Sequence, residues 1–133
     1  SDLSDMERIG DQAADIAELS RYISEKPLLE KVHISDICCV VMNMVTDSVE
    51  ALVKKDEILA RKVIGDDIAD ELFVRIKEEL VSLIQENRTE PQEILDLLMA
   101  AKYFERVGDH AVNIAEWVEF IVTGMHDDRE CGH

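Results

Sequence analysis

The sequence predicts an all-α protein, folded as an antiparallel helical bundle, and three observations carry this prediction. Only 5 Gly and 2 Pro occur among 133 residues, so the chain has few places at which it can turn sharply. Leu, Ile, Val, Ala, Glu and Asp dominate, and this mixture favours long helices over strands. Hydrophobic residues make up 47% of the chain and recur at helical spacing, enough to fill the core of one domain.

Four helices are expected from this spacing and from the residues that begin and end helices. The first runs from about Leu3 to Glu25, and Pro27 follows its end. The second runs from about Leu28 to Lys54 and should turn one apolar stripe inward. That stripe consists of Ile34, Ile37, Val41, Val45, Val49 and Leu52.

The third helix is expected from Asp56, whose side chain can cap the first turn, to Glu86. Gly65 lies inside it, costs about 1 kcal/mol relative to Ala and can mark a local irregularity. Its inward residues should be Ile64, Ile68, Leu72, Ile76, Leu80 and Leu83. The fourth helix begins at Pro91, a favoured first helical residue, and is closed by Gly124 in the left-handed conformation.

The charge and the cysteines narrow the class of protein. The formal net charge is −16, from 30 acids against 14 bases, so the chain lacks the basic surface that binds nucleic acid. This charge is compatible with binding of cations, with basic partner proteins, or with solubility alone. No apolar stretch approaches the ~20 residues of a membrane span. Cys38 and Cys39 are neighbours expected to pack as small hydrophobes, and with Cys131 they make no disulfide framework, so a reducing cytoplasm is expected.

One twelve-residue motif occurs twice. Residues 7–18, ERIGDQAADIAE, are identical at most positions to residues 105–116, ERVGDHAVNIAE, which indicates a duplicated unit. Polar side chains recur in both copies at positions i, i+4 and i+8, so they line one solvent-accessible stripe of each helix. The stripes are Glu7, Asp11 and Asp15 on the first helix and Glu105, Asp109 and Asn113 on the last. Gly10 and Gly108, beside these acids, suggest that something approaches the backbone closely there.

A third acidic pair points to a metal site. Asp66 and Asp70 have the i, i+4 spacing, and an antiparallel bundle can set them beside Glu105 and Asp109. Oxygen ligands from two facing helices favour a hard or borderline cation. Like charges at this spacing repel by a few tenths of a kcal/mol, roughly, and a bound cation would offset that. In a chain with 30 acids, however, such pairs also arise on a solvated face without purpose.

The doubled signature E-R-x-G-D-x-A-x-x-I-A-E, with D-x-x-x-D before its second copy, resembles the PhoU family. The resemblance is strongest from Lys102 to Gly124, KYFERVGDHAVNIAEWVEFIVTG. That family's fold is two three-helix bundles related by an internal repeat. The resemblance therefore implies that residues 1–26 are the last helix of an incomplete first repeat. Residues 27–124 would be a complete second repeat, and 125–133 a flexible tail.

The resemblance also implies a function. PhoU proteins are cytoplasmic negative regulators of phosphate uptake and of phosphate-regulon signalling, acting between the phosphate ABC transporter and a sensor histidine kinase. They bind iron or zinc clusters, or manganese or magnesium, through acidic motifs. Carried over to this sequence, the second metal site would be Asp66, Asp70, Glu105, Asp109 and Asn113. The first would be Glu7, Asp11 and Asp15, where Asp15 stands in place of the family's Asn.

Other functions stay open at this point. A PhoU-like bundle can be the soluble tail of a sodium/phosphate cotransporter, or a helical interaction module that binds no metal. An enzyme is not expected, because the acids face away from the apolar stripe and no Ser, His and acid set sits on a loop scaffold. The apolar stripe of the first helix, Ile9, Ile16 and Ile23, predicts self-association, most simply as a homodimer.

Overall fold

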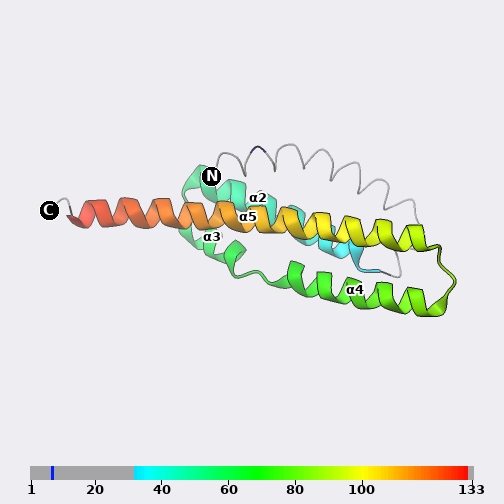
Figure 1. Ribbon diagram of the computed structural model, residues 1–133. Helices are drawn as coiled ribbons and strands as arrows, with labels where there is room; N and C mark the ends of the chain where they lie inside the picture. Colours follow the sequence, from blue (N-terminus) through cyan, green and yellow to red (C-terminus); the bar gives the residue numbers. More distant parts are fainter. Residues whose placement is uncertain (1–6, 8–31, 132–133) are drawn as a thin grey trace.

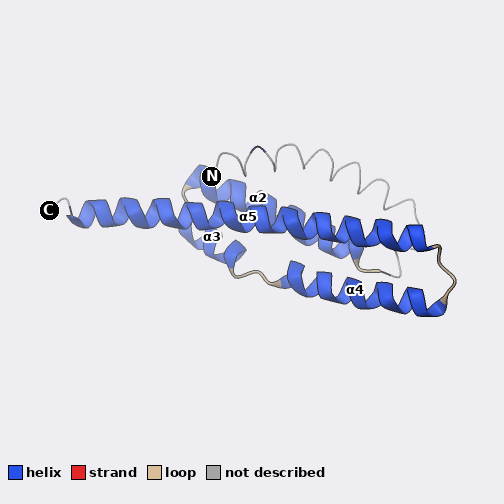
Figure 2. Ribbon diagram, in the orientation of Figure 1, coloured by secondary structure: helices blue, strands red, loops and turns tan. Residues whose placement is uncertain are grey.

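The computed structural model describes residue 7 and residues 32–131, and the side chains of the latter range as far as Gly124. All regular secondary structure in these residues is helical, which confirms the all-α prediction (Figure 2). The described helices in chain order are α2 (Ile34–Lys54), α3 (Glu57–Ile64), α4 (Ile68–Glu86) and α5 (Pro91–Cys131). The predicted first helix, Leu3–Glu25, lies outside the described residues.

The helices form an up-down-up bundle with three members: α2, then α3 with α4, then α5. Figure 1 shows α2 and α5 running side by side in the same direction, while α3 and α4 run in the opposite direction alongside them. The packing of α2 against α5 is the most extensive of any helix pair, and α3 and α4 each pack on α5 as well. Consecutive long elements are therefore antiparallel, and α3 and α4 together make up the middle member of the bundle.

Helix α2 starts later than predicted, and the start is held by a contact to α4. Val32 and His33 are not helical, so the helix begins at Ile34 rather than at Leu28. The backbone N–H of His33 donates to Glu79 Oε1 at 3.2 Å, and His33 Nδ1 lies 2.8 Å from Oε2 of the same carboxylate. This contact ties the start of α2 to α4.

The predicted end of α2 at Lys54 is confirmed. Lys55 follows in the left-handed conformation, with φ 53°, and its N–H bonds to the carbonyl of Ala51. The predicted cap of the next helix is also confirmed, since Asp56 Oδ1 accepts a hydrogen bond of 3.1 Å from the N–H of Leu59. Capping side chains of this kind satisfy a backbone donor that has no partner within the helix.

The predicted single helix from Asp56 to Glu86 is wrong, because the structure breaks it at Gly65. Helix α3 ends at Ile64 and α4 begins at Ile68. Asp66 Oδ1 accepts a 3.0 Å hydrogen bond from the N–H of Ile68, so a side chain satisfies a donor at the start of the new helix. The break changes the helical phase, and Ile68, predicted to face inward, is half exposed.

The predicted end of the last helix at Gly124 is also wrong. Helix α5 passes through this residue and continues to Cys131, so the boundary of the predicted tail falls inside a helix. A Cβ at Gly124 would meet nothing within 4 Å, so no neighbouring element packs closely on this residue. A glycine costs a helix only about 1 kcal/mol relative to Ala, and here the helix continues on both sides.

The core lies between the helices and contains most of the predicted inward residues. Of the predicted α2 stripe, the first three residues are buried and the last three are half-buried. Cys38 is buried as expected, but Cys39 is exposed. The largest fully buried side chains include Phe104, Ile34, Ile37, Ile76, Ile114, Val41, Val63, Val107 and Val118.

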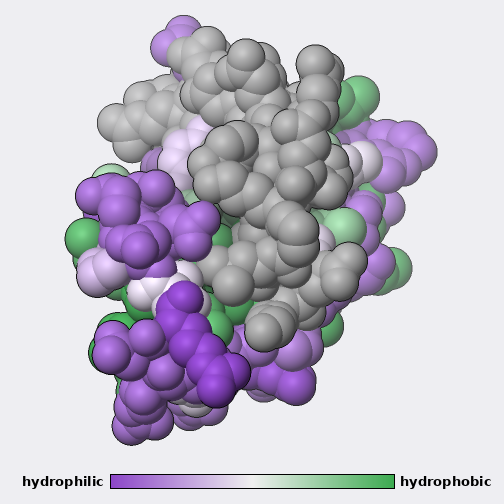
Figure 3. Space-filling view, turned by 90° about the vertical axis from the view of Figure 1, so that its right-hand side faces the viewer, coloured by the Kyte–Doolittle hydropathy of each residue, from purple (hydrophilic) through white to green (hydrophobic). Residues whose placement is uncertain are grey.

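One face of the bundle can be seen in the space-filling view. The described residues on the face shown in Figure 3 are mainly hydrophilic, with hydrophobic side chains visible in isolated spots between them. Across residues 32–131, no helix combines the length and the apolar character needed to cross a membrane.

Candidate functional site

Asp109 lies close enough to two other carboxylates, one on each of two helices, to be repelled by both. Partial desolvation of its carboxyl raises the pKa of Asp109 above its ordinary value, and the charges of Glu105 and then Asp70 raise the pKa further. Asp70 stands in the first turn of α4, whereas Glu105 and Asp109 stand one turn apart on α5. Asp70 is thus near enough for its charge to act on Asp109, and the use of these acids as metal donors stays a prediction. Asp109 and Asn113 are exposed, as predicted for the stripe, whereas Glu105, the third member, is half-buried beside Lys102.

A lysine already sits among these acids. Lys102 Nζ lies 2.6 Å from Glu105 Oε1, and the Glu105 side chain is only 16% exposed. The same ammonium lies 5.2 Å from the centroid of the Phe73 ring on α4 and lowers the pKa of Asp109. Sequence reasoning did not single out Lys102. The i, i+3 spacing between Lys102 and Glu105 was the available signal, since side chains at that spacing meet on a helix.

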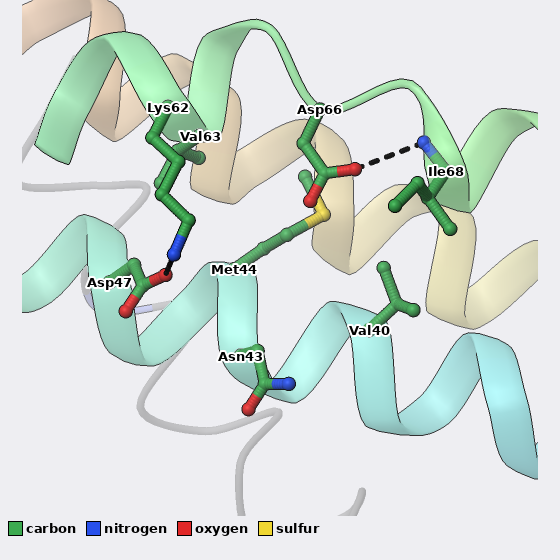
Figure 4. A pocket seen from close by; sticks show the side chains of 8 residues that line it. All are labelled: Val40, Asn43, Met44, Asp47, Lys62, Val63, Asp66 and Ile68. Carbon is green, nitrogen blue, oxygen red and sulfur yellow. Dashed lines mark hydrogen bonds and ion pairs between the residues drawn. The ribbon is translucent and has the colours of Figure 1, made fainter.

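Asp66 occupies a different place from the one predicted. The i, i+4 helical relation between Asp66 and Asp70 does not exist, because Asp66 lies in the linker that precedes α4. Its carboxylate lines a pocket together with residues of α2, as Figure 4 shows. The break at Gly65 thus separates the two aspartates that the sequence pattern placed on one stripe.

The described structure does not arrange the predicted metal donors as a ready metal site. Among the described side chains, no group of three or more His, Cys, Asp and Glu is arranged to hold a metal ion. The oxygen donors of Asp70, Glu105 and Asp109 suit a hard cation in kind, and their repulsion favours one. To bind it, their side chains must converge and release Lys102. Glu7 of the first predicted site is exposed, while Asp11 and Asp15 lie outside the described residues.

Close packing of α2 on α5 explains why a glycine stands at position 108. Gly108 is buried, and a Cβ built on it would lie 3.5 Å from Val41 Cγ2 and 3.8 Å from Met44 Cε, both on α2. The element that comes close to the backbone beside Asp109 is therefore a neighbouring helix. The pattern correctly indicated a close approach, and the structure identifies it as packing between α2 and α5. Gly10 lies outside the described residues.

Comparisons with known proteins agree with this fold and motif. Residues 34–118 match the family described as the PhoU domain. The "Phosphate-specific transport system accessory protein PhoU homolog" of Clostridium acetobutylicum is 33% identical over 128 residues, covering 95% of this chain and 58% of the relative. The protein of that name from Aquifex aeolicus is 37% identical over 106 residues, with coverage of 78% and 48%.

A third relative, "Phosphate-specific transport system accessory protein PhoU homolog 1" of Thermotoga maritima, is 34% identical over 126 residues, covering 92% of this chain and 54% of the relative. The chain thus spans about half the length of the curated relatives that it matches. No solved structure matches it.

Proposed function

Because the chain belongs to the PhoU family, we propose that it serves phosphate transport as an accessory protein and not as an enzyme. The observation that carries the proposal is the family match over residues 34–118, which takes in the bundle from the start of α2 to Val118 of α5. The relatives that carry the accessory-protein name are similar over most of this chain. The matched region includes Asp70, Glu105 and Asp109.

The finer form of the proposal is a cytoplasmic adaptor that represses phosphate uptake and phosphate-regulon signalling. Its partners would be the phosphate ABC transporter and the sensor histidine kinase. A formal net charge of −16 supports recognition of basic partner surfaces, because opposite potentials steer such proteins together. The repeated motif supports a site on α5 that takes part in this regulation.

The proposed metal site consists of Asp70 on α4 with Glu105, Asp109 and Asn113 on α5, and Asp66 stays a predicted donor from the linker. A cation held there would neutralise the repulsion that raises the pKa of Asp109. Because the donors come from two helices, the ion would also fix α4 relative to α5. Iron, zinc, manganese and magnesium are the candidate ions. Elemental analysis of untagged protein, with a Glu105→Gln/Asp109→Asn double variant as comparison, tests the site directly.

The regulatory role is tested in cells that lack their own copy of the gene. The full-length gene is returned, and phosphate uptake and a phosphate-regulon reporter are measured in phosphate-rich medium. The wild-type gene should restore repression, and the Glu105→Gln/Asp109→Asn variant should fail to do so. Asp96→Asn is the matched control, because Asp96 is an exposed carboxylate on the same helix.

The two parts of the proposal fail in different ways. If the wild-type gene does not restore repression, the regulatory role is wrong. If the double variant restores repression as well as the wild type does, the carboxylates of α5 are not needed for it. Circular dichroism of each purified variant separates loss of function from loss of fold.

A further inference from the structure

A second site, unrelated to the repeated motif, lies where the chain breaks between α3 and α4. A pocket of about 190 Å³ opens between this linker and α2. Residues of α2, α3 and the start of α4 converge on it in Figure 4. The lining residues are Val40, Asn43, Met44, Asp47, Lys62, Val63, Asp66 and Ile68.

The pocket carries more negative than positive charge. Two carboxylates, Asp47 and Asp66, face it against the single ammonium of Lys62. Lys62 Nζ lies 3.4 Å from Asp47 Oδ2, near the limit of a hydrogen bond, and the lysine side chain is 70% exposed. An exposed pair with this geometry contributes little stability and is easily replaced. One oxygen of Asp66 accepts the N–H of Ile68, which leaves the other for a ligand.

The remaining walls are apolar. Val63 and Met44 are buried, and Val40 and Ile68 line the pocket with them. A cavity of about 150 Å³ holds a benzene molecule, so this pocket has room for a group of similar size. A suitable ligand therefore combines an aliphatic stem, to lie on the apolar walls, with a cationic head for the two carboxylates.

We propose that this pocket receives an arginine side chain presented by a partner protein. A guanidinium group makes paired hydrogen bonds to carboxylates that an ammonium cannot make, so it would replace Lys62 on Asp47. The formal net charge of −16 favours a partner with a basic surface. This inference goes beyond the proposed regulatory role. Asp66 is shared with the predicted metal site but Asp47 is not, so variants of Asp47 let the two proposals fail separately.

The test uses methyl-labelled protein and NMR spectroscopy. The probe is the peptide acetyl-Gly-Arg-Gly-amide, and its neutral isostere contains citrulline in place of arginine. The arginine peptide should shift the methyl signals of Met44 and Ile68 in a saturable manner. The methyl signals of Ile84, at the other end of α4, should not move. Citrulline should give no saturable shift, because it has the shape of arginine without its charge.

Substitutions then identify the contacts. Asp47→Asn should weaken binding about tenfold, as expected for a hydrogen bond between charged groups. Lys62→Gln should strengthen binding severalfold, because it removes the competing ammonium, and a purely structural role for Lys62 predicts no such gain. Asp96→Asn, far along α5, should leave binding unchanged. The proposal is overturned by equal shifts with citrulline, by the absence of shifts, or by unchanged affinity in Asp47→Asn.

Discussion

Lys102 Nζ lies 2.6 Å from Glu105 Oε1 while resting 5.2 Å from the centre of the Phe73 ring. The carboxylate, one turn before Asp109, is thus neutralised by a group of the protein itself. Any metal ion that uses Glu105 must displace this ammonium and break its contact with the aromatic ring. If the acids of α4 and α5 bind a cation as proposed, Lys102 competes with that cation for Glu105.

Removing Lys102 should raise the affinity of the cluster for divalent cations. A unit charge a few ångströms away opposes a cation by about 1 kcal/mol or more, so Lys102→Gln should tighten Mn²⁺ binding by about fivefold or more. Isothermal titration calorimetry measures this affinity. Lys77→Gln is the matched control, because Lys77 lies over the same Phe73 ring at 4.8 Å, and it should change the affinity much less. Equal gains in both variants would contradict a specific competition by Lys102.

Replacing Asp109 by Asn should stabilise the metal-free protein at neutral pH. Partial desolvation and the charges of Glu105 and Asp70 raise the pKa of Asp109 above 3.8, so the folded chain holds this proton to a higher pH than the unfolded chain does. Stability therefore falls as the pH rises from 3.8 through the folded pKa. Asp109→Asn removes that loss, and the gain should be a few tenths of a kcal/mol, roughly the size of a like-charge pair.

Urea unfolding with a chelator present, at several pH values, measures this effect. The stability difference between Asp109→Asn and wild type should be largest at neutral pH and should shrink as the pH approaches 3.8. Asp96→Asn serves as the control on the same helix. A variant that is less stable than wild type at neutral pH would show that Asp109 makes a stabilising contact that outweighs the repulsion.

Gly108 should tolerate a methyl group but not a larger side chain. A Cβ there lies 3.5 Å from Val41 Cγ2, an ordinary contact distance, and alanine is favoured over glycine within a helix by about 1 kcal/mol. Gly108→Ala should therefore keep or raise the free energy of unfolding. Gly108→Leu should lower it by about 1–3 kcal/mol, because it overfills the contact with α2. Thermal unfolding of the two variants tests the order, and a destabilised Gly108→Ala would contradict it.

The two left-handed residues offer a matched pair of stabilising substitutions. Lys55 and Asn87 each have φ of 53° and end α2 and α4. A side chain other than Asn or Asp costs about 1–2 kcal/mol in this conformation, whereas Gly adopts it freely. Lys55→Gly should therefore stabilise by about 0.5–1 kcal/mol after the entropy cost of glycine is subtracted. Asn87→Gly should gain less, because Asn tolerates the conformation. Denaturant melts that reverse this order would contradict the explanation.

The helix boundaries show what the sequence can and cannot predict. Lys54, Asp56, Glu86 and Pro91 were placed correctly, because capping groups and proline act within one turn of the chain. At Gly65 the sequence predicts a local irregularity within one helix, but it does not predict that the helix ends there. Two further contributions favour two helices over one: the Asp66 side chain accepts a hydrogen bond at the start of α4, and α3 and α4 each pack on α5. The packing on α5 depends on tertiary contacts, so it cannot be predicted from the residues around Gly65 alone.

In the candidate site, too, local features could be predicted from the sequence and tertiary contacts could not. Helical spacing predicted that Asp109 and Asn113 are exposed, and antiparallel packing predicted that Asp70 lies near Asp109. The position of Asp66 was wrong because it depended on an unbroken helix. The role of Lys102 was missed because its partner Phe73 belongs to another helix. Its pairing with Glu105 could have been predicted from their i, i+3 spacing.

The length of α5 has a mechanical consequence. Its 41 residues span about 60 Å, whereas the 21 residues of α2 span about 32 Å. Figure 1 shows the last turns of α5 projecting past the ends of α2 and α3. From Gly108, where α2 touches the helix, the projecting end is about 35 Å away. A tilt of about 5° at that contact would move the end by about 3 Å, so α5 has the leverage to turn a small change in the bundle into a larger displacement at its tip.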